Sequence, residues 1–129
     1  MVNYWLVNHN WLSFSQTREY CGFRSDFEQM KIHPLDKIVY FGDGLVLGLF
    51  EAVELVKNEF NGWKGHYPYQ IRIKLLEIPN NPPKGELQID WLKTKFMLRK
   101  DAGGSANLMP LTEKEFDEVV KAFSQTYIP

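Results

Sequence analysis

The chain has 129 residues and a mass of 15.2 kDa, which is enough for one domain with its own core. Hydrophobic residues make up 44% and charged residues 24%, a balance that excludes a mainly disordered chain. The single cysteine, Cys21, excludes a disulfide framework and fits a reducing compartment. No apolar run reaches the roughly 18 residues of a membrane span, and no signal peptide follows Met1. We therefore expect a cytoplasmic protein with no membrane partner.

Charge is distributed unevenly along the chain, although the net charge is only −1. Residues 1–63 carry 5 Lys/Arg against 8 Asp/Glu, residues 64–100 carry 8 against 3, and residues 101–129 carry 2 against 5. The basic middle segment favours a local cationic patch. Separate solvated lysines on strands and loops are the alternative that charge alone leaves open.

The first third of the chain predicts a strand followed by short helices. Residues 3–8 are rich in β-formers and predict the strand. Ser13 begins an S-x-x-Q capping box and Gly22 is a typical helix-ending residue, so a helix is predicted over residues 14–21. Residues 26–30 predict a further helical turn.

The middle of the chain predicts an antiparallel hairpin. Residues 37–41 and 45–53 read as two strands, and Asp43-Gly44 between them is a pair favoured in tight turns. Gly48 within the second strand predicts a bulge or bend, as in small curved sheets.

The last half predicts one more strand and a terminal helix. Apolar and polar residues alternate over residues 69–75, which gives a strand with one buried and one basic face. Residues 87–98 fit either a strand or a helix. Thr112 to Glu115 forms a second capping box, followed by apolar residues at helical spacing: Phe116, Val119, Val120 and Phe123. Residues 1–129 thus predict a single α+β domain with a small, curved, mainly antiparallel sheet.

No catalytic, cofactor-binding or metal-binding motif is present in the sequence. The histidines, His9, His33 and His66, match no metal-ligand spacing, and no nucleophile elbow or phosphate-cradling loop occurs. We therefore predict a protein that is not an enzyme and that carries no cofactor and no metal. A nucleophilic Cys21 next to a histidine is the alternative, but a lone cysteine is far more often a small buried residue.

Polar and aromatic residues in three loops are the candidates for a binding site. Asn10 follows the first strand, and its amide offers the donor and the acceptor that reading a base edge requires. The alternative is that its side chain satisfies backbone groups in a strand-to-helix turn, which spacing alone favours. The segment 20–25 and the segment 60–69, with Trp63 between two glycines, place rings in loops rather than at core spacing. A stacking slot and a purely structural ring cluster both remain possible at this point.

The ordered set of motifs resembles an EVE domain. The resemblance runs over nearly the whole chain and is carried by Tyr4-Trp5-Leu6-Val7, Gly22-Phe23-Arg24, Pro34 to Phe41, Val46 to Val53, Tyr67 to Lys74 and Met109 to Phe116. EVE domains belong to the PUA-like superfamily, together with the YTH readers of N6-methyladenine. The resemblance implies a small PUA-like β-barrel with peripheral helices.

The resemblance also implies a pocket into which a modified base is flipped. The implied base-binding residues are Asn10, Gly22, Phe23, Arg24, Ser25, Phe60, Trp63 and Tyr67. Trp63, or else Phe60, would be the stacking ring. Phosphates beside the base would contact the basic segment, where the candidates are Arg72, Lys74, Lys93, Lys95, Arg99 and Lys100.

The sequence departs from the YTH pattern in two places. Arg24 stands where YTH domains carry a tryptophan, and Leu35-Asp36 replaces the usual Gly-Asp. The base modification that is read can therefore differ from N6-methyladenine.

The implied partner is nucleic acid that carries a methylated or hydroxymethylated base. DNA is favoured over RNA only by analogy with modification-dependent restriction systems, in which such a module works with an NTPase or nuclease. The alternatives are an RNA-binding PUA-like module that reads a modified RNA base and, less favoured, a small-molecule-binding or hydrolytic protein.

Overall fold

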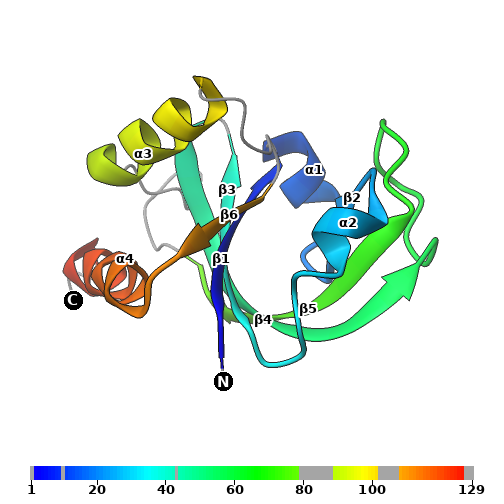
Figure 1. The fold of residues 1–129 in the computed structure, drawn as a ribbon, viewed down its shortest axis with the longest axis horizontal. Coiled ribbons are helices and arrows are strands. Elements are labelled where there is room, and N and C mark those ends of the chain that lie inside the picture. Colours follow the sequence, from blue (N-terminus) through cyan, green and yellow to red (C-terminus); the bar gives the residue numbers. More distant parts are fainter. Residues whose placement is uncertain (1, 10, 43, 79–88, 102–107, 127–129) are drawn as a thin grey trace.

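Six strands form one strongly curved sheet in the order β2-β5-β4-β3-β1-β6 (Figure 1). The computed structural model describes every residue except 1, 10, 43, 79–88, 102–107 and 127–129. The strands are β1 (Tyr4–His9), β2 (Tyr20–Phe23), β3 (Lys37–Gly42), β4 (Leu45–Lys57), β5 (Tyr69–Glu77) and β6 (Leu108–Leu111). The helices are α1 (Trp11–Gln16), α2 (Asp26–Gln29), α3 (Asp90–Asp101) and α4 (Glu113–Thr126). The expected α+β class with a mainly antiparallel sheet is confirmed, and the described strands curve without closing into a barrel.

The predicted hairpin forms the centre of the sheet. β3 and β4 pair antiparallel, and Gly44 adopts the left-handed φ of 79° that the tight turn requires. Tyr40 pairs with Gly48 and Phe41 pairs with Val46, which leaves Leu47 as an extra residue in β4. The bulge expected at Gly48 is thus present beside it, and such bulges bend a strand.

β1 enters the sheet between β3 and β6. It runs parallel to β3 and antiparallel to β6. Buried Asp36, just before β3, fixes the start of β1, because its carboxylate accepts hydrogen bonds from the Asn3 N–H and the Trp5 Nε1–H, each at 3.0 Å. The same carboxylate accepts the His33 N–H at 2.9 Å.

The first predicted helix is corrected by the structure. The helix covers α1, and residues 20–23, assigned in part to the helix from sequence, form the edge strand β2. Gly22 is therefore a strand residue paired with Gln70 and not a helix terminator. The pairing of β2 with β5 buries Cys21 and Phe23 completely, and this non-local gain outweighs the local capping signal.

The later helices agree with the sequence patterns. The ambiguous segment 87–98 is described from residue 89 and becomes helix α3. The second capping box forms as predicted, since the Glu115 N–H donates to Thr112 Oγ1 at 3.1 Å and the Thr112 N–H donates to Glu115 Oε1 at 2.9 Å. β6 is an additional strand that no sequence pattern indicated. None of the helices in the described ranges is long and apolar enough to span a membrane.

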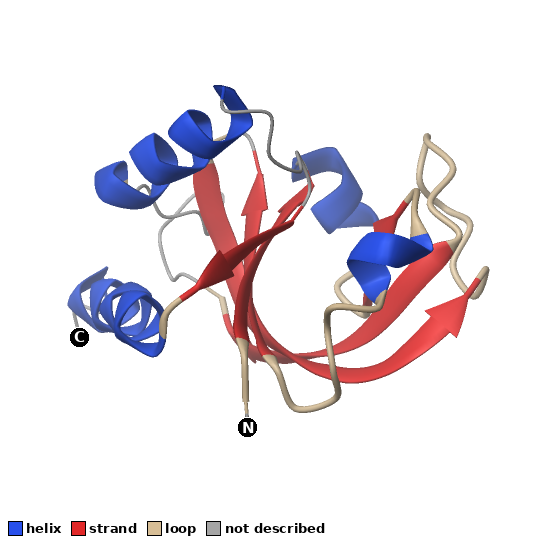
Figure 2. Ribbon diagram, in the orientation of Figure 1, coloured by secondary structure: helices blue, strands red, loops and turns tan. Residues whose placement is uncertain are grey.

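The two faces of the sheet bury separate cores (Figure 2). Along β3, Val39 and Phe41 pack toward α3 and α4, whereas Ile38 and Tyr40 pack with Phe14 of α1 on the other face. This alternation follows from the two-residue period of a strand. α1, α2 and the loop between β4 and β5 therefore lie together on the inner side of the curve.

Candidate functional site

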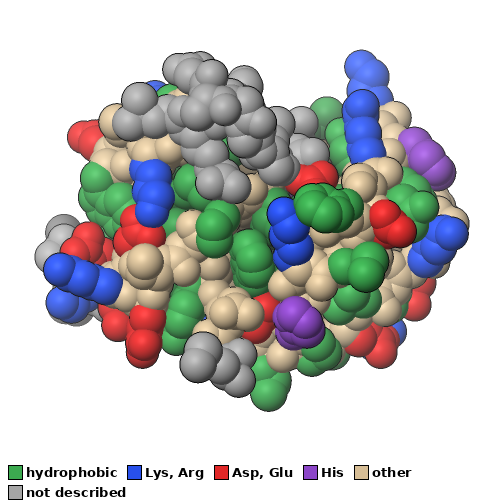
Figure 3. All heavy atoms as spheres, viewed as in Figure 1, with side chains coloured by type: hydrophobic (Ala, Val, Ile, Leu, Met, Phe, Trp, Pro, Cys, Tyr) green, Lys and Arg blue, Asp and Glu red, His purple; other side chains and the backbone are tan. Residues whose placement is uncertain are grey.

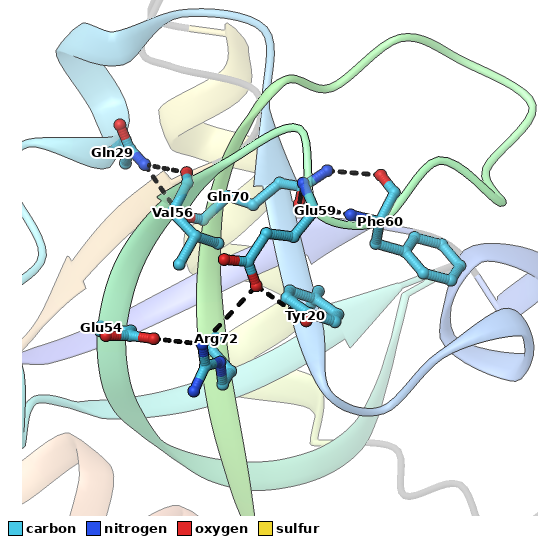
Figure 4. A network of polar contacts seen from close by, with 8 residues as sticks. All are labelled: Tyr20, Gln29, Glu54, Val56, Glu59, Phe60, Gln70 and Arg72. Atoms are coloured by element: carbon cyan, nitrogen blue, oxygen red, sulfur yellow. Dashed lines mark hydrogen bonds and ion pairs between the residues drawn. The ribbon is translucent and has the colours of Figure 1, made fainter.

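The loop of residues 58–68, between β4 and β5, is organised by one buried amide. The Oε1 atom of Gln70 accepts the N–H groups of Glu59 at 3.1 Å and Phe60 at 2.9 Å. Its Nε2 donates to the Phe60 carbonyl at 2.6 Å (Figure 4). The same nitrogen also donates to the Tyr67 carbonyl at 3.0 Å. Gln70 is only 1% exposed, so these four bonds form away from water. A side chain from β5 thus fixes both ends of the loop.

Trp63 packs inward from this loop and is only 6% exposed. Its Nε1–H donates to the Ser13 carbonyl at 3.2 Å. Its ring centroid lies 4.8 Å from that of Phe60 and 5.4 Å from that of His9. Trp63 and Phe60 are brought together as the sequence predicted, but Trp63 is held by the protein's own rings.

Gly22 has no side chain, and this leaves the space on β2 in which the Trp63 ring packs. A Cβ atom at position 22 would lie 2.6 Å from Trp63 Cζ3 and 2.9 Å from Tyr67 Cβ. The glycine is required here by close approach of a ring to the strand. Phe23, beside it, was expected in the pocket wall, and the structure places its side chain fully buried in the core.

His9 packs against the same strand at the end of β1. Its Nε2 atom lies 2.8 Å from the Gly22 carbonyl oxygen and 3.2 Å from the Gly22 nitrogen. Its half-buried ring also packs against Tyr40 and Tyr67. Desolvation lowers the pKa of His9, and the hydrogen bond with Gly22 opposes this only in part. The imidazole is therefore held in its neutral form.

Two cations and a ring meet in a surface hollow beside Trp63. This hollow, named the Arg24 hollow here, has a volume of about 400 Å³ and is lined by Leu12, Ser13, Gln16, Arg24, Lys64 and Tyr67. The Arg24 guanidinium carbon lies 5.2 Å from the centroid of the Tyr67 ring, within cation–π range. The volume falls in the usual range for small-molecule sites, about 300–1,000 Å³. Arg24 and Tyr67 were predicted site residues, and Lys64 was missed although it directly follows Trp63.

A second hollow lies on the other side of residues 64–67. This Asn61 hollow has a volume of about 240 Å³, and its lining includes Asn58, Phe60, Asn61, Lys64, His66 and Tyr67. Lys and Arg side chains and a histidine gather over this end of the molecule, at the upper right of Figure 3. The loop is thus a polar, cationic rim around a buried tryptophan.

The predicted phosphate-binding residues whose side chains the structure describes lie on two elements, and two of them are ion-paired. Arg72 is ion-paired with Glu54 and lies 3.6 Å from Glu59. Lys95 is ion-paired with Glu115. Arg72 and Lys74 lie on β5, whereas Lys93 and Lys95 lie on α3, on the outer side of the sheet (Figure 1). The described residues of the basic segment therefore lie on two separate elements, β5 and α3.

The remaining predicted site residues have other surroundings or are not described. Ser25 caps α2, since its Oγ accepts the Phe27 N–H at 3.1 Å. Asn10 and the side chains of Arg99 and Lys100 lie outside the described residues. Cys21 is buried, and burial raises the pKa of its thiol to about 12.

The chain has the fold of YTH domains. It matches the crystal structure of the Mmi1 YTH domain with a TM-score of 0.65 at 12% identity, over 96% of this chain and 89% of that chain. The Mmi1 YTH domain in complex with RNA matches with a TM-score of 0.64 at 12% identity, over 96% of this chain and 79% of that chain.

A bacterial structure shares the same fold. The NMR structure of Rpa0253 from Rhodopseudomonas palustris matches with a TM-score of 0.64 at 16% identity, over 98% of this chain and 97% of that chain. No protein-family model matches the sequence. No curated protein matches it either.

Proposed function

We propose that this chain is an EVE domain that binds nucleic acid and reads a modified base at the Arg24 hollow. The observation that carries the proposal is the meeting of Arg24, Lys64 and Tyr67 in one open hollow. A nucleic acid needs such a combination, because cations bind its phosphates and a ring stacks on its bases. The YTH fold and the RNA complex of Mmi1 support the proposal.

The hollow gives each group a role in this reading. A base that is unstacked or flipped from its strand packs on Tyr67, and such stacking contributes roughly 1–3 kcal/mol per base. Arg24 and Lys64 bind the flanking phosphates. Trp63 holds the Tyr67 ring in position, because the two rings pack edge to face with centroids 5.8 Å apart.

The proposed partner is DNA with a methylated or hydroxymethylated base. The chain is proposed to recognise this base as the binding module of a system that also contains an NTPase or nuclease. RNA with a modified base is the second candidate, and the RNA complex of a protein of the same fold favours it. In both cases the chain binds without catalysing a reaction. Its one thiol agrees with this, since a cysteine with a pKa of about 12 is a poor nucleophile at neutral pH.

Fluorescence anisotropy with four matched oligonucleotides tests the proposal. The oligonucleotides are DNA and RNA of one sequence, each with and without a single modified base. Arg24→Gln should weaken binding of the preferred oligonucleotide. Arg18→Gln is the matched control, because Arg18 also lies over a ring, that of Phe14, at 5.0 Å and does not line the hollow. If the modified and plain oligonucleotides bind equally in both backbones, the proposed reading is wrong.

A further inference from the structure

Residues 64–67 form a ridge between two hollows. Lys64, Gly65 and Tyr67 line both the Arg24 hollow and the Asn61 hollow. Because they share these lining residues, the two hollows adjoin each other. A ligand with two planar groups joined by a short anionic linker matches this arrangement.

We propose that the Asn61 hollow binds the nucleotide next to the modified one and selects its base. This inference rests on the proposed function and adds a second, sequence-reading subsite to it. Its volume of about 240 Å³ is below the usual range for small-molecule sites, so it suits one ring system rather than an extended ligand.

The chemistry of the second hollow differs from that of the first. Asn58, Asn61 and His66 supply polar groups that can donate and accept hydrogen bonds, as the edge of a base requires. Asn58 is held in place, because its backbone has a left-handed φ of 55° and its N–H donates to the Pro68 carbonyl at 2.9 Å. Phe60 adds a ring to the same hollow, and its ring stacks with Tyr20 at a centroid distance of 6.0 Å.

Lys64 connects the two subsites. It lines both hollows and is exposed, and no ion pair to a carboxylate is found for it among the described residues. The phosphodiester that joins the two nucleotides would cross the ridge at this residue. Anchoring a phosphate here fixes the register in which one base enters each hollow.

The test uses single-stranded oligonucleotides with the same central modified base and one varied neighbour. Each side is varied separately through the four bases, and affinity is measured by anisotropy. The native chain should prefer one neighbour on one side by at least about 5-fold, the lower limit expected for a good base-edge contact. Asn61→Ala, or Asn58→Gly, which tolerates the positive φ, should reduce this preference below about 2-fold. Neither should change the ratio of modified to plain affinity.

The outcomes separate this inference from the function on which it rests. Asn3→Ala is the control, because Asn3 is an exposed asparagine before β1 and lines neither hollow. If the native chain discriminates the modified base but binds all neighbours equally, the second subsite is wrong and the proposed function stands. The same conclusion follows if both variants keep the native preference. If the modified base is not discriminated at all, the proposed function fails and this inference fails with it.

Discussion

Gln70 forms two hydrogen bonds to the same residue, Phe60. Its side-chain oxygen accepts the Phe60 N–H at 2.9 Å, and its side-chain nitrogen donates to the Phe60 carbonyl at 2.6 Å. A buried side-chain amide thus pairs with both the N–H and the C=O of one loop residue, as the opposite residue of a neighbouring antiparallel strand would. The position of Phe60, Trp63 and Tyr67 depends on this pair.

Gln70→Leu tests that dependence. Leucine keeps the approximate volume but leaves four backbone groups of the loop without their partner, and each unsatisfied buried group costs about 1–3 kcal/mol. Because the loop can move toward water, we expect a loss of about 2–4 kcal/mol in the free energy of unfolding, measured by urea denaturation. Gln16→Leu, at an exposed position, should cost less than about 0.5 kcal/mol. Equal costs for the two variants would show that the amide does not organise the loop.

Gly22→Ala should destabilise the fold by about 1–3 kcal/mol, because the added methyl group overlaps Trp63 and Tyr67. A double-mutant cycle with Trp63→Leu separates this overlap from a general preference for glycine. The cost of the alanine should fall in the leucine background, because leucine removes the ring atoms of the closest contact. Additive costs in the cycle would contradict the contact.

The free energy of unfolding should depend on pH because burial lowers the pKa of His9. Its pKa in the folded chain is below the ordinary value of 6.5, so between these values the unfolded chain binds more protons. Stability is therefore full above about pH 6.5 and falls as the pH decreases toward the folded pKa, with a slope below about 1.4 kcal/mol per pH unit.

His9→Gln should remove this slope between about pH 5 and 6.5 in urea denaturation series, the range in which an ordinary histidine begins to titrate. His66→Gln is the control, because His66 is exposed on the loop and should leave the slope in place. The hydrogen bond with Lys37 lowers the pKa of Glu51. Desolvation raises the pKa of Glu115, but its hydrogen bonds with Lys95 and Thr112 outweigh this and lower it. The stability that these two carboxylates contribute is therefore lost only at lower pH than that of His9. If the slope of unfolding free energy against pH is the same in His9→Gln as in the native chain, the slope does not come from His9.

Lys64→Gln should lower oligonucleotide affinity and reduce the salt dependence of binding by about one counterion. Lys57→Gln is its matched control, since Lys57 lies over the Tyr69 ring at 5.4 Å and outside both hollows. The slope of log affinity against log salt is the measurement. An unchanged slope for Lys64→Gln would exclude a phosphate contact at the ridge.

Cys21 should be unreactive toward a thiol reagent at pH 8 in the native chain and react fully in denaturant. The reason is its complete burial and a thiol pKa of about 12. Absorbance during reaction with a chromogenic disulfide measures the rate. Fast reaction of Cys21 in the native chain would instead favour the alternative of a hydrolytic protein with Cys21 as its nucleophile.

Elements with local signals were predicted well from the sequence. The Thr112–Glu115 box and the Asp43-Gly44 turn each place their determinants within a few residues, so α4 and the β3–β4 hairpin follow directly. The role of Gly22 was not predictable from its neighbours in sequence, because it comes from Trp63, 41 positions away, and from pairing with Gln70.

The candidate site was predicted only in part for the same reason. The loop with Trp63 was identified because rings between glycines do not fit core spacing, yet Trp63 is buried and the half-buried Tyr67 is the ring that lines the hollow. The division of the basic segment between β5 and α3 depends on where these two elements pack in the fold, which local composition does not encode.

The position of β1 between β3 and β6 affects how the chain folds during its synthesis on the ribosome. β1 is synthesised first, but its second neighbour begins only at residue 108. A nascent chain that has already assembled β1 to β5 therefore carries a bare strand edge, with free peptide groups that can join another polypeptide. Translation of β6 covers that edge with a strand of only four residues, which is a poorer template for pairing. Premature stop codons before β6 should therefore yield aggregates rather than a smaller soluble domain.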